Sequence, residues 1–146
     1  MKTWHAVLLA VVGVAHIAQR QVHQRQQAEI AVTQLHQDWL GQLIERPHLA
    51  VQWGLDGMNE EEMVHTLSAN QQLSALGLRD RLGLLRGPRL DFVADAFVQK
   101  QIGRRYWDRC GAYREEEAAG DRAAERFCRA LKNARRAYPK TDPVGV

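Results

Sequence analysis

The chain has few of the residues that hold small domains together through covalent bridges or metal ions. Its only cysteines are Cys110 and Cys128, and they do not form the CxxC pair of a zinc or redox site. Because two such thiols do not make a disulfide framework, we expect both to be free. No bridge is needed, since the roughly 120 residues beyond the N-terminal segment suffice to fold around one core.

The sequence also lacks the usual signatures of catalysis. Ser68 and Ser74 are predicted to lie within a helix, and neither stands in the GxSxG turn that exposes a hydrolase nucleophile. The six histidines are scattered, with no HxxxH or HExxH pair to present two imidazoles to one metal. No glycine-rich loop followed by lysine is there to hold phosphates. We therefore expect no catalytic residue, no metal site, no cofactor and no enzymatic activity.

The most informative feature that is present is an apolar run at the N-terminus. Residues 4–18 are almost wholly apolar, and His16 is the only polar interruption from residue 6 onward. Apolar side chains would therefore cover every face of a helix, which indicates insertion into a membrane rather than an amphipathic surface helix. Fifteen residues span only about 22 Å of a hydrocarbon core of about 30 Å, so the anchor is a short one.

Three interpretations of this run remain open. Arg20 and Arg25 follow it, and the more basic flank of a membrane helix stays in the cytoplasm. This favours an uncleaved, single-pass anchor in the cell membrane with a cytoplasmic C-terminal domain. A cleaved signal peptide is the alternative, because Lys2, the short apolar run and Gly13-Val14-Ala15 resemble its three regions. The third interpretation is a buried helix of a soluble protein.

Beyond the apolar run, apolar residues recur at steps of three and four along one helical stripe. Proline disfavours helix at the preceding residue, so the helix is expected to stop at Arg46-Pro47. Residues 47–57 are then expected to form a loop, because they include Trp53-Gly54 and Asp56-Gly57. The stripe residues are Ala28, Val32, Leu35, Trp39 and Leu43.

Local signals predict further helices and no strand. Asn59 before three glutamates is typical of an N-cap, and Gly87-Pro88 marks the end of one helix and the start of another. A change of apolar phase between residues 97 and 106 requires a break, which we expect at Gly103. The last helix is expected from about Asp121 to Tyr138. We predict an all-α protein with four parts: a transmembrane anchor (1–18), a stalk helix packing on the bundle (19–46), a helical bundle (47–139) and a flexible tail (140–146).

Positive charge is concentrated in the C-terminal half. Residues 1–78 carry four Lys/Arg and seven Asp/Glu, whereas residues 79–146 carry sixteen and ten. A basic stripe on the last helix is either an ordinary solvated face or a contact for anionic lipid. Nucleic acid is not an expected partner, because no aromatic residue lies between these cations for bases to stack on. The stripe consists of Arg122, Arg126, Arg129, Lys132 and Arg136.

Two further features are candidates for interaction. Asn70 lies on an apolar stripe, where an unsatisfied amide is costly, so we expect it to bond to the backbone of a neighbouring helix or loop, or else to a ligand. A second cluster is rich in the residue types that dominate binding hot spots, and it is the expected contact for a protein partner. It consists of Arg104, Arg105, Trp107 and Arg109, of which Trp107 is equally a candidate for the core.

The order of several stretches resembles a known family. These are the apolar start leading into Arg20-Gln21, the segment Leu35 to Glu45 running to Arg46-Pro47, the segment Gly103 to Trp107, and a last helix with Phe127 and Tyr138. Together they are similar to an actinobacterial family of small proteins, domain of unknown function 6082. The resemblance implies a helical, often membrane-anchored protein and supplies no catalytic residue. Where similar proteins tend to have Asp-Pro, this chain has Arg46-Pro47.

The sequence thus favours a membrane-anchored, non-catalytic module that contacts a protein partner or the membrane surface. The alternative is an exported or soluble helical enzyme or ligand-binding domain, with a pocket near Asn70, Tyr106 and Trp107.

Overall fold

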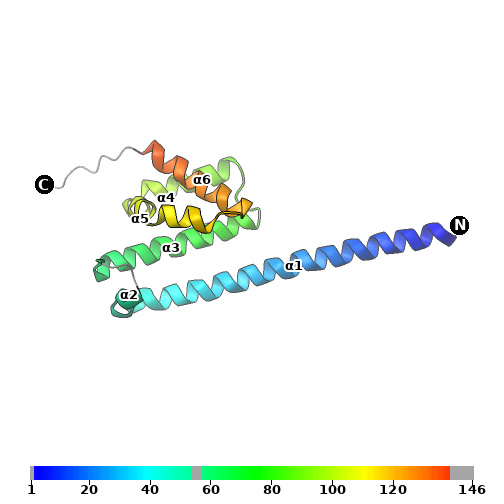
Figure 1. Ribbon diagram of the computed structural model, residues 1–146, viewed down its shortest axis with the longest axis horizontal. Coiled ribbons are helices and arrows are strands. Elements are labelled where there is room, and N and C mark those ends of the chain that lie inside the picture. Colours follow the sequence, from blue (N-terminus) through cyan, green and yellow to red (C-terminus); the bar gives the residue numbers. More distant parts are fainter. Residues whose placement is uncertain (1, 54–56, 139–146) are drawn as a thin grey trace.

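The computed structural model describes the backbone of residues 2–53 and 57–138 and the side chains of residues 14–52 and 57–138. Over these residues the chain forms six α-helices and no strand, which confirms the all-α prediction (Figure 1). The expected flexible tail, 140–146, lies outside the described residues. The helices are α1 (Lys2–Glu45), α2 (Pro47–Trp53), α3 (Glu60–Arg81), α4 (Pro88–Gln99), α5 (Gln101–Glu117) and α6 (Arg122–Ala137).

Helices α1 and α3 form an antiparallel hairpin closed by α2 (Figure 1). The loop predicted for residues 47–57 is wrong over Pro47–Trp53, because Pro47 begins α2 instead of only ending α1. Proline suits a first helical position, where its fixed φ is helical and its missing N–H is not needed. A small core closes this end of the hairpin and contains Leu43, Ala50, Met58 and Met63.

The side of α1 that faces α3 differs from the predicted stripe. The buried and half-buried positions include Ile30, Gln37 and Leu40, and the Gln37 side chain donates to the backbone oxygen of Gln71 at 2.8 Å. Of the predicted stripe only Leu43 is buried, while Leu35 is 74 % exposed. Spacing predicted the helix, but the position of α3 decides which face of α1 is covered.

Helices α3 to α6 enclose the main core, which includes Leu73, Phe97, Trp107 and Leu131. The break predicted at Gly103 occurs three residues earlier, at Lys100 between α4 and α5. Gly103 lies inside α5, where a Cβ atom would come within 2.1 Å of the Phe97 carbonyl oxygen. The absence of a side chain at Gly103 therefore allows α5 to approach the end of α4 closely.

The predicted helix starts are confirmed by their capping bonds. Asn59 accepts a hydrogen bond from the backbone N–H of Glu62 at 2.9 Å, and Asp121 accepts from those of Ala123 and Ala124. Gly87 and Pro88 begin α4 as expected. Each of these signals acts through residues a few positions apart, so it does not depend on how distant parts of the chain pack.

The N-terminal half of α1 extends beyond the bundle (Figure 1). Val14 and Ile17 on this part are exposed. In the part of the chain that the structure describes, no helix has both the length and the hydropathy needed to cross a bilayer.

Candidate functional site

A cleft of about 520 Å³ opens where α1 diverges from α3. Helix α1 contributes Ala28 and Val32 to one wall, and the bundle forms the rest. The volume lies within the range of small-molecule sites, and the lining is mainly apolar. The bundle residues at its base include Leu73, Leu78, Trp107, Phe127, Cys128 and Leu131.

Arg114 lies at one end of this cleft in a hydrogen-bonded network. Its Nε donates to the Tyr106 hydroxyl at 2.9 Å and its Nη2 donates to the Asn70 amide oxygen, which also accepts from the Tyr106 hydroxyl at 2.8 Å. Asn70 therefore bonds to a neighbouring helix as expected, but to side chains of α5 and not to backbone. Burial raises the pKa of Tyr106, and the nearby Arg114 charge opposes that shift.

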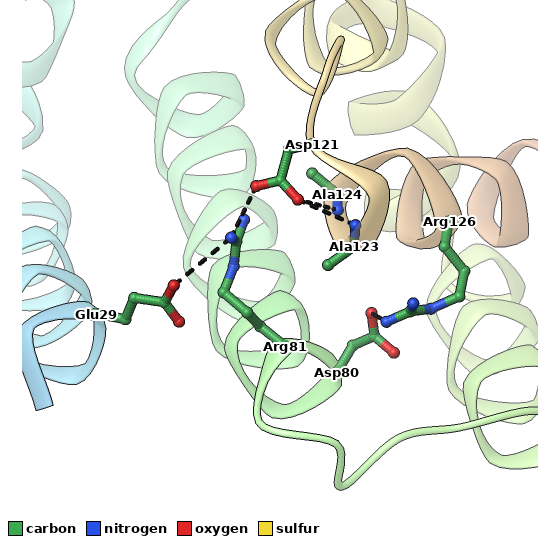
Figure 2. Close-up of polar contacts among 7 residues, drawn as sticks. All are labelled: Glu29, Asp80, Arg81, Asp121, Ala123, Ala124 and Arg126. Carbon is green, nitrogen blue, oxygen red and sulfur yellow. Dashed lines mark hydrogen bonds and ion pairs between the residues drawn. The ribbon is translucent and has the colours of Figure 1, made fainter. Parts of the chain in front are cut away.

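Charged residues from three helices meet at the other end of the cleft (Figure 2). Arg81 of α3 pairs with Asp121 at 2.7 Å and with Glu29 of α1 at 3.7 Å. Asp121 caps α6 through its other oxygen, and these bonds from Ala124, Arg81 and Ala123 lower the pKa of its carboxyl. The three charged side chains thus connect α1 and α3 to the start of α6.

Asp80, next to this group, is the buried acid of the core at 1 % exposure (Figure 2). Its Oδ2 pairs with Nη2 of Arg126 at 2.7 Å. The other carboxylate oxygen and the Nε of Arg126 are buried without a hydrogen-bond partner. Removing Arg126 would leave the buried Asp80 carboxylate without its ion-pair partner. Arg126, a member of the predicted basic stripe, therefore has a structural role.

The remaining stripe residues divide into paired and solvated cations. Lys132 pairs with Glu115 of α5 at 2.5 Å. Arg122, Arg129 and Arg136 are exposed and form no ion pair with another described residue. They recur every seven residues, so they follow one line along α6 at spacings of about 10 Å.

The predicted cluster on α5 does not lie on one surface. Trp107 is buried and covers Gly111, so it belongs to the core. Arg104 donates to the carbonyl oxygens of Val98 and Gln99, at 2.9 and 2.8 Å, and so caps the end of α4.

The other two arginines of that cluster do lie together. Arg105 and Arg109 are exposed and line a second groove of about 530 Å³ between α5 and α3. His65 and Thr66 of α3 line its opposite wall. Their role as a partner contact stays a prediction.

The two cysteines are free thiols, as expected. Burial raises the pKa of both Cys110 and Cys128. Among the described residues no group of three or more His, Cys, Asp or Glu side chains is arranged to hold a metal ion.

Several residues of the cleft were not identified as site residues from the sequence. Arg81, Arg114 and Glu29 occur within long helices, where charged residues are expected on any solvated face. Only Asp121 could be recognised from the sequence, because an aspartate directly after Gly120 is typical of a helix N-cap. The cleft itself depends on the divergence of α1 from α3, which no local pattern specifies.

Comparison with protein families gives a match over nearly the whole chain. A family model described as a family of unknown function (DUF6082) covers residues 2–145. No curated protein and no solved structure matches the chain.

Proposed function

We propose that this chain, which belongs to the DUF6082 family of unknown function, is a membrane-tethered, non-catalytic interaction module. One observation carries the proposal: the start of α1 extends past the bundle (Figure 1), and the side chains of Val14 and Ile17 on this part are exposed to solvent. An apolar segment of this kind is stabilised by lipid, since each buried methylene contributes about 0.8 kcal/mol. The run at residues 4–18 thereby serves as a single-pass anchor with the bundle in the cytoplasm.

The end of the bundle nearest the anchor is suited to a membrane surface. Arg81 pairs with Glu29, and Glu29 lies about 16 Å along α1 from Ala18, the last residue of the apolar run. The α3–α4 loop at this end exposes Leu84 and Arg86. A basic residue near an anionic leaflet contributes about 1 kcal/mol, and an exposed leucine gains from contact with the headgroup region.

One exposed cation of α6 adds to this basic end. Arg122 directly follows Asp121, so it lies at the same end of the bundle, whereas Arg129 and Arg136 lie about 10 and 21 Å farther along α6, away from this end. The second groove, lined by Arg105 and Arg109, is the candidate contact for a protein partner.

A second candidate function is that of a ligand-binding domain. The cleft between α1 and the bundle favours it, because about 520 Å³ of mainly apolar space beside polar groups is typical of small-molecule sites. This function does not require the anchor.

The surface contact is tested with a polarity-sensitive fluorophore on a Leu84→Cys variant of the whole chain in liposomes. We expect stronger fluorescence with anionic phosphatidylglycerol than with phosphatidylcholine alone, because the basic end would approach the lipid. Reversing the exposed Arg86, Arg89 and Arg122 at this end to glutamate should remove the difference.

The control variant makes the same change in net charge elsewhere. Lys100→Glu, Arg105→Glu and Arg109→Glu together alter exposed residues of the other surface, and the lipid response should remain. Equal fluorescence in both lipids for the unreversed protein would refute the surface contact.

A further inference from the structure

The charges around the cleft are not balanced at its two ends. Arg81 is neutralised by two carboxylates, those of Asp121 at 2.7 Å and Glu29 at 3.7 Å. Arg114 donates its closest hydrogen bonds to the neutral groups of Asn70 and Tyr106. Its ion pair with Glu117 is as long as that between Arg81 and Glu29, at 3.7 Å. A cation whose closest partners are neutral keeps its attraction for an anion.

The acid that pairs with Arg114, Glu117, also lines the cleft but is a weak competitor for a ligand. Glu117 stands 3.7 Å from Arg114, and its side chain is 57 % exposed. Exposed pairs of this kind contribute at most about 1 kcal/mol. A ligand carboxylate entering the partly buried end of the cleft therefore displaces little.

The space beyond Arg114 is apolar and elongated. The α3 residues that line the cleft run from Leu73 to Arg81, eight positions along the helix, so the cleft extends for roughly 12 Å along α3 between its charged ends. The walls between them include Val32, Leu73 and Phe127. A ligand that fits has one anionic group and a single apolar tail.

We propose that the cleft binds a free long-chain fatty acid, with its carboxylate on Arg114 and its tail along Leu73 and Phe127 towards Arg81. The carboxylates of Glu29 and Asp121 at the far end disfavour a second anionic group there. A single tail matches a cleft of about 520 Å³ better than a two-tailed phospholipid does. The inference rests on the ligand-binding candidate function and is independent of the anchor.

The test uses the whole chain in membranes with a diazirine-bearing palmitic acid as the probe. After illumination, labelled peptides are identified by mass spectrometry. We expect label on peptides containing Leu73 and Phe127. Unlabelled palmitic acid should compete at least tenfold better than its methyl ester, because the ester has no carboxylate for Arg114.

Variants separate binding from loss of folding. Arg114→Gln should reduce labelling of the cleft peptides about tenfold, and Val32→Glu should do so too while leaving the fold intact, because Val32 is largely exposed. Arg109→Gln, an exposed site of α5 in the other groove, is the matched control and should label normally.

Three results would overturn the proposal. They are label confined to residues 4–18, equal competition by the methyl ester, and cleft labelling by a diazirine phosphatidylglycerol as strong as by the fatty acid. Repeating the labelling on detergent-solubilised chain distinguishes failure of the cleft from failure of the anchor, since only the cleft is then being tested.

Discussion

Individual residues in this protein are constrained mainly by contacts between helices. Arg114, Asn70 and Tyr106 form one such contact, between α3 and α5, and Gly103 forms another, between α5 and the end of α4. A residue of this kind is hard to replace, because its neighbour belongs to a different helix that must move to accommodate the change.

Gly103→Ala should destabilise the protein by about 1–3 kcal/mol or more, because the new methyl group would collide with the Phe97 carbonyl oxygen. Gly41→Ala is the matched control within a helix, since a Cβ there meets no atom within 4 Å. That change should stabilise by about 0.5–1 kcal/mol, the usual gain of alanine over glycine. Urea unfolding measures both, and equal effects would contradict the close approach.

Asp121→Ala should cost about 1 kcal/mol near neutral pH, because α6 loses its N-cap. The pKa of the Asp121 carboxyl is lowered in the fold, so its contribution is present above the unfolded pKa of about 3.9 and is lost as the pH falls through the lower folded value. The stability gap between wild type and variant should therefore be level at pH 5–8 and shrink below about pH 4. Asp95→Ala, at an exposed site in α4, should open no comparable gap, and a gap that persists at pH 2 would disprove a carboxylate effect.

The starts and ends of several helices could be predicted from the sequence because the signals for them are local. Asn59, Gly87-Pro88 and Asp121 act through bonds or steric limits within a few residues. The same reasoning failed at Pro47, because a proline that ends one helix can also occupy the first position of the next, as it does in α2. The face of α1 that packs, the position of the break near Gly103 and the partners of Arg114 all depend on helices distant in sequence. Neither the cleft nor its arginine network was therefore predictable, although Asn70 was recognised as needing a partner.

The packing face of α1 is tested by two leucines of the same helix. Leu40 is 1 % exposed and Leu35 is 74 % exposed. Leu40→Ala should lower the free energy of unfolding by about 2–5 kcal/mol, whereas Leu35→Ala should change it by less than about 0.5 kcal/mol. The reverse order would mean that α1 packs through the stripe predicted from spacing.

The whole molecule combines a long arm with a compact bundle (Figure 1). The N-terminal half of α1 and the end of the bundle that carries the α3–α4 loop point the same way, because α3 runs antiparallel to α1 (Figure 1). On the proposed function, the arm fixes the distance of the bundle from the lipid, and the exposed Arg86 and Arg122 at the near end of the bundle add attraction to the leaflet. The cleft opens between the arm and the bundle, so a ligand bound there would contact both.

Cell fractionation tests the membrane tether most directly. Residues 1–146 are produced in bacterial cells, and the membrane pellet is washed with alkaline carbonate after high-speed centrifugation. The account predicts that the chain stays in the pellet with its N-terminus intact by mass spectrometry, while a variant starting at Gln19 is released to the supernatant. Recovery of the uncleaved chain in the supernatant would contradict the tether, and with it the proposed function.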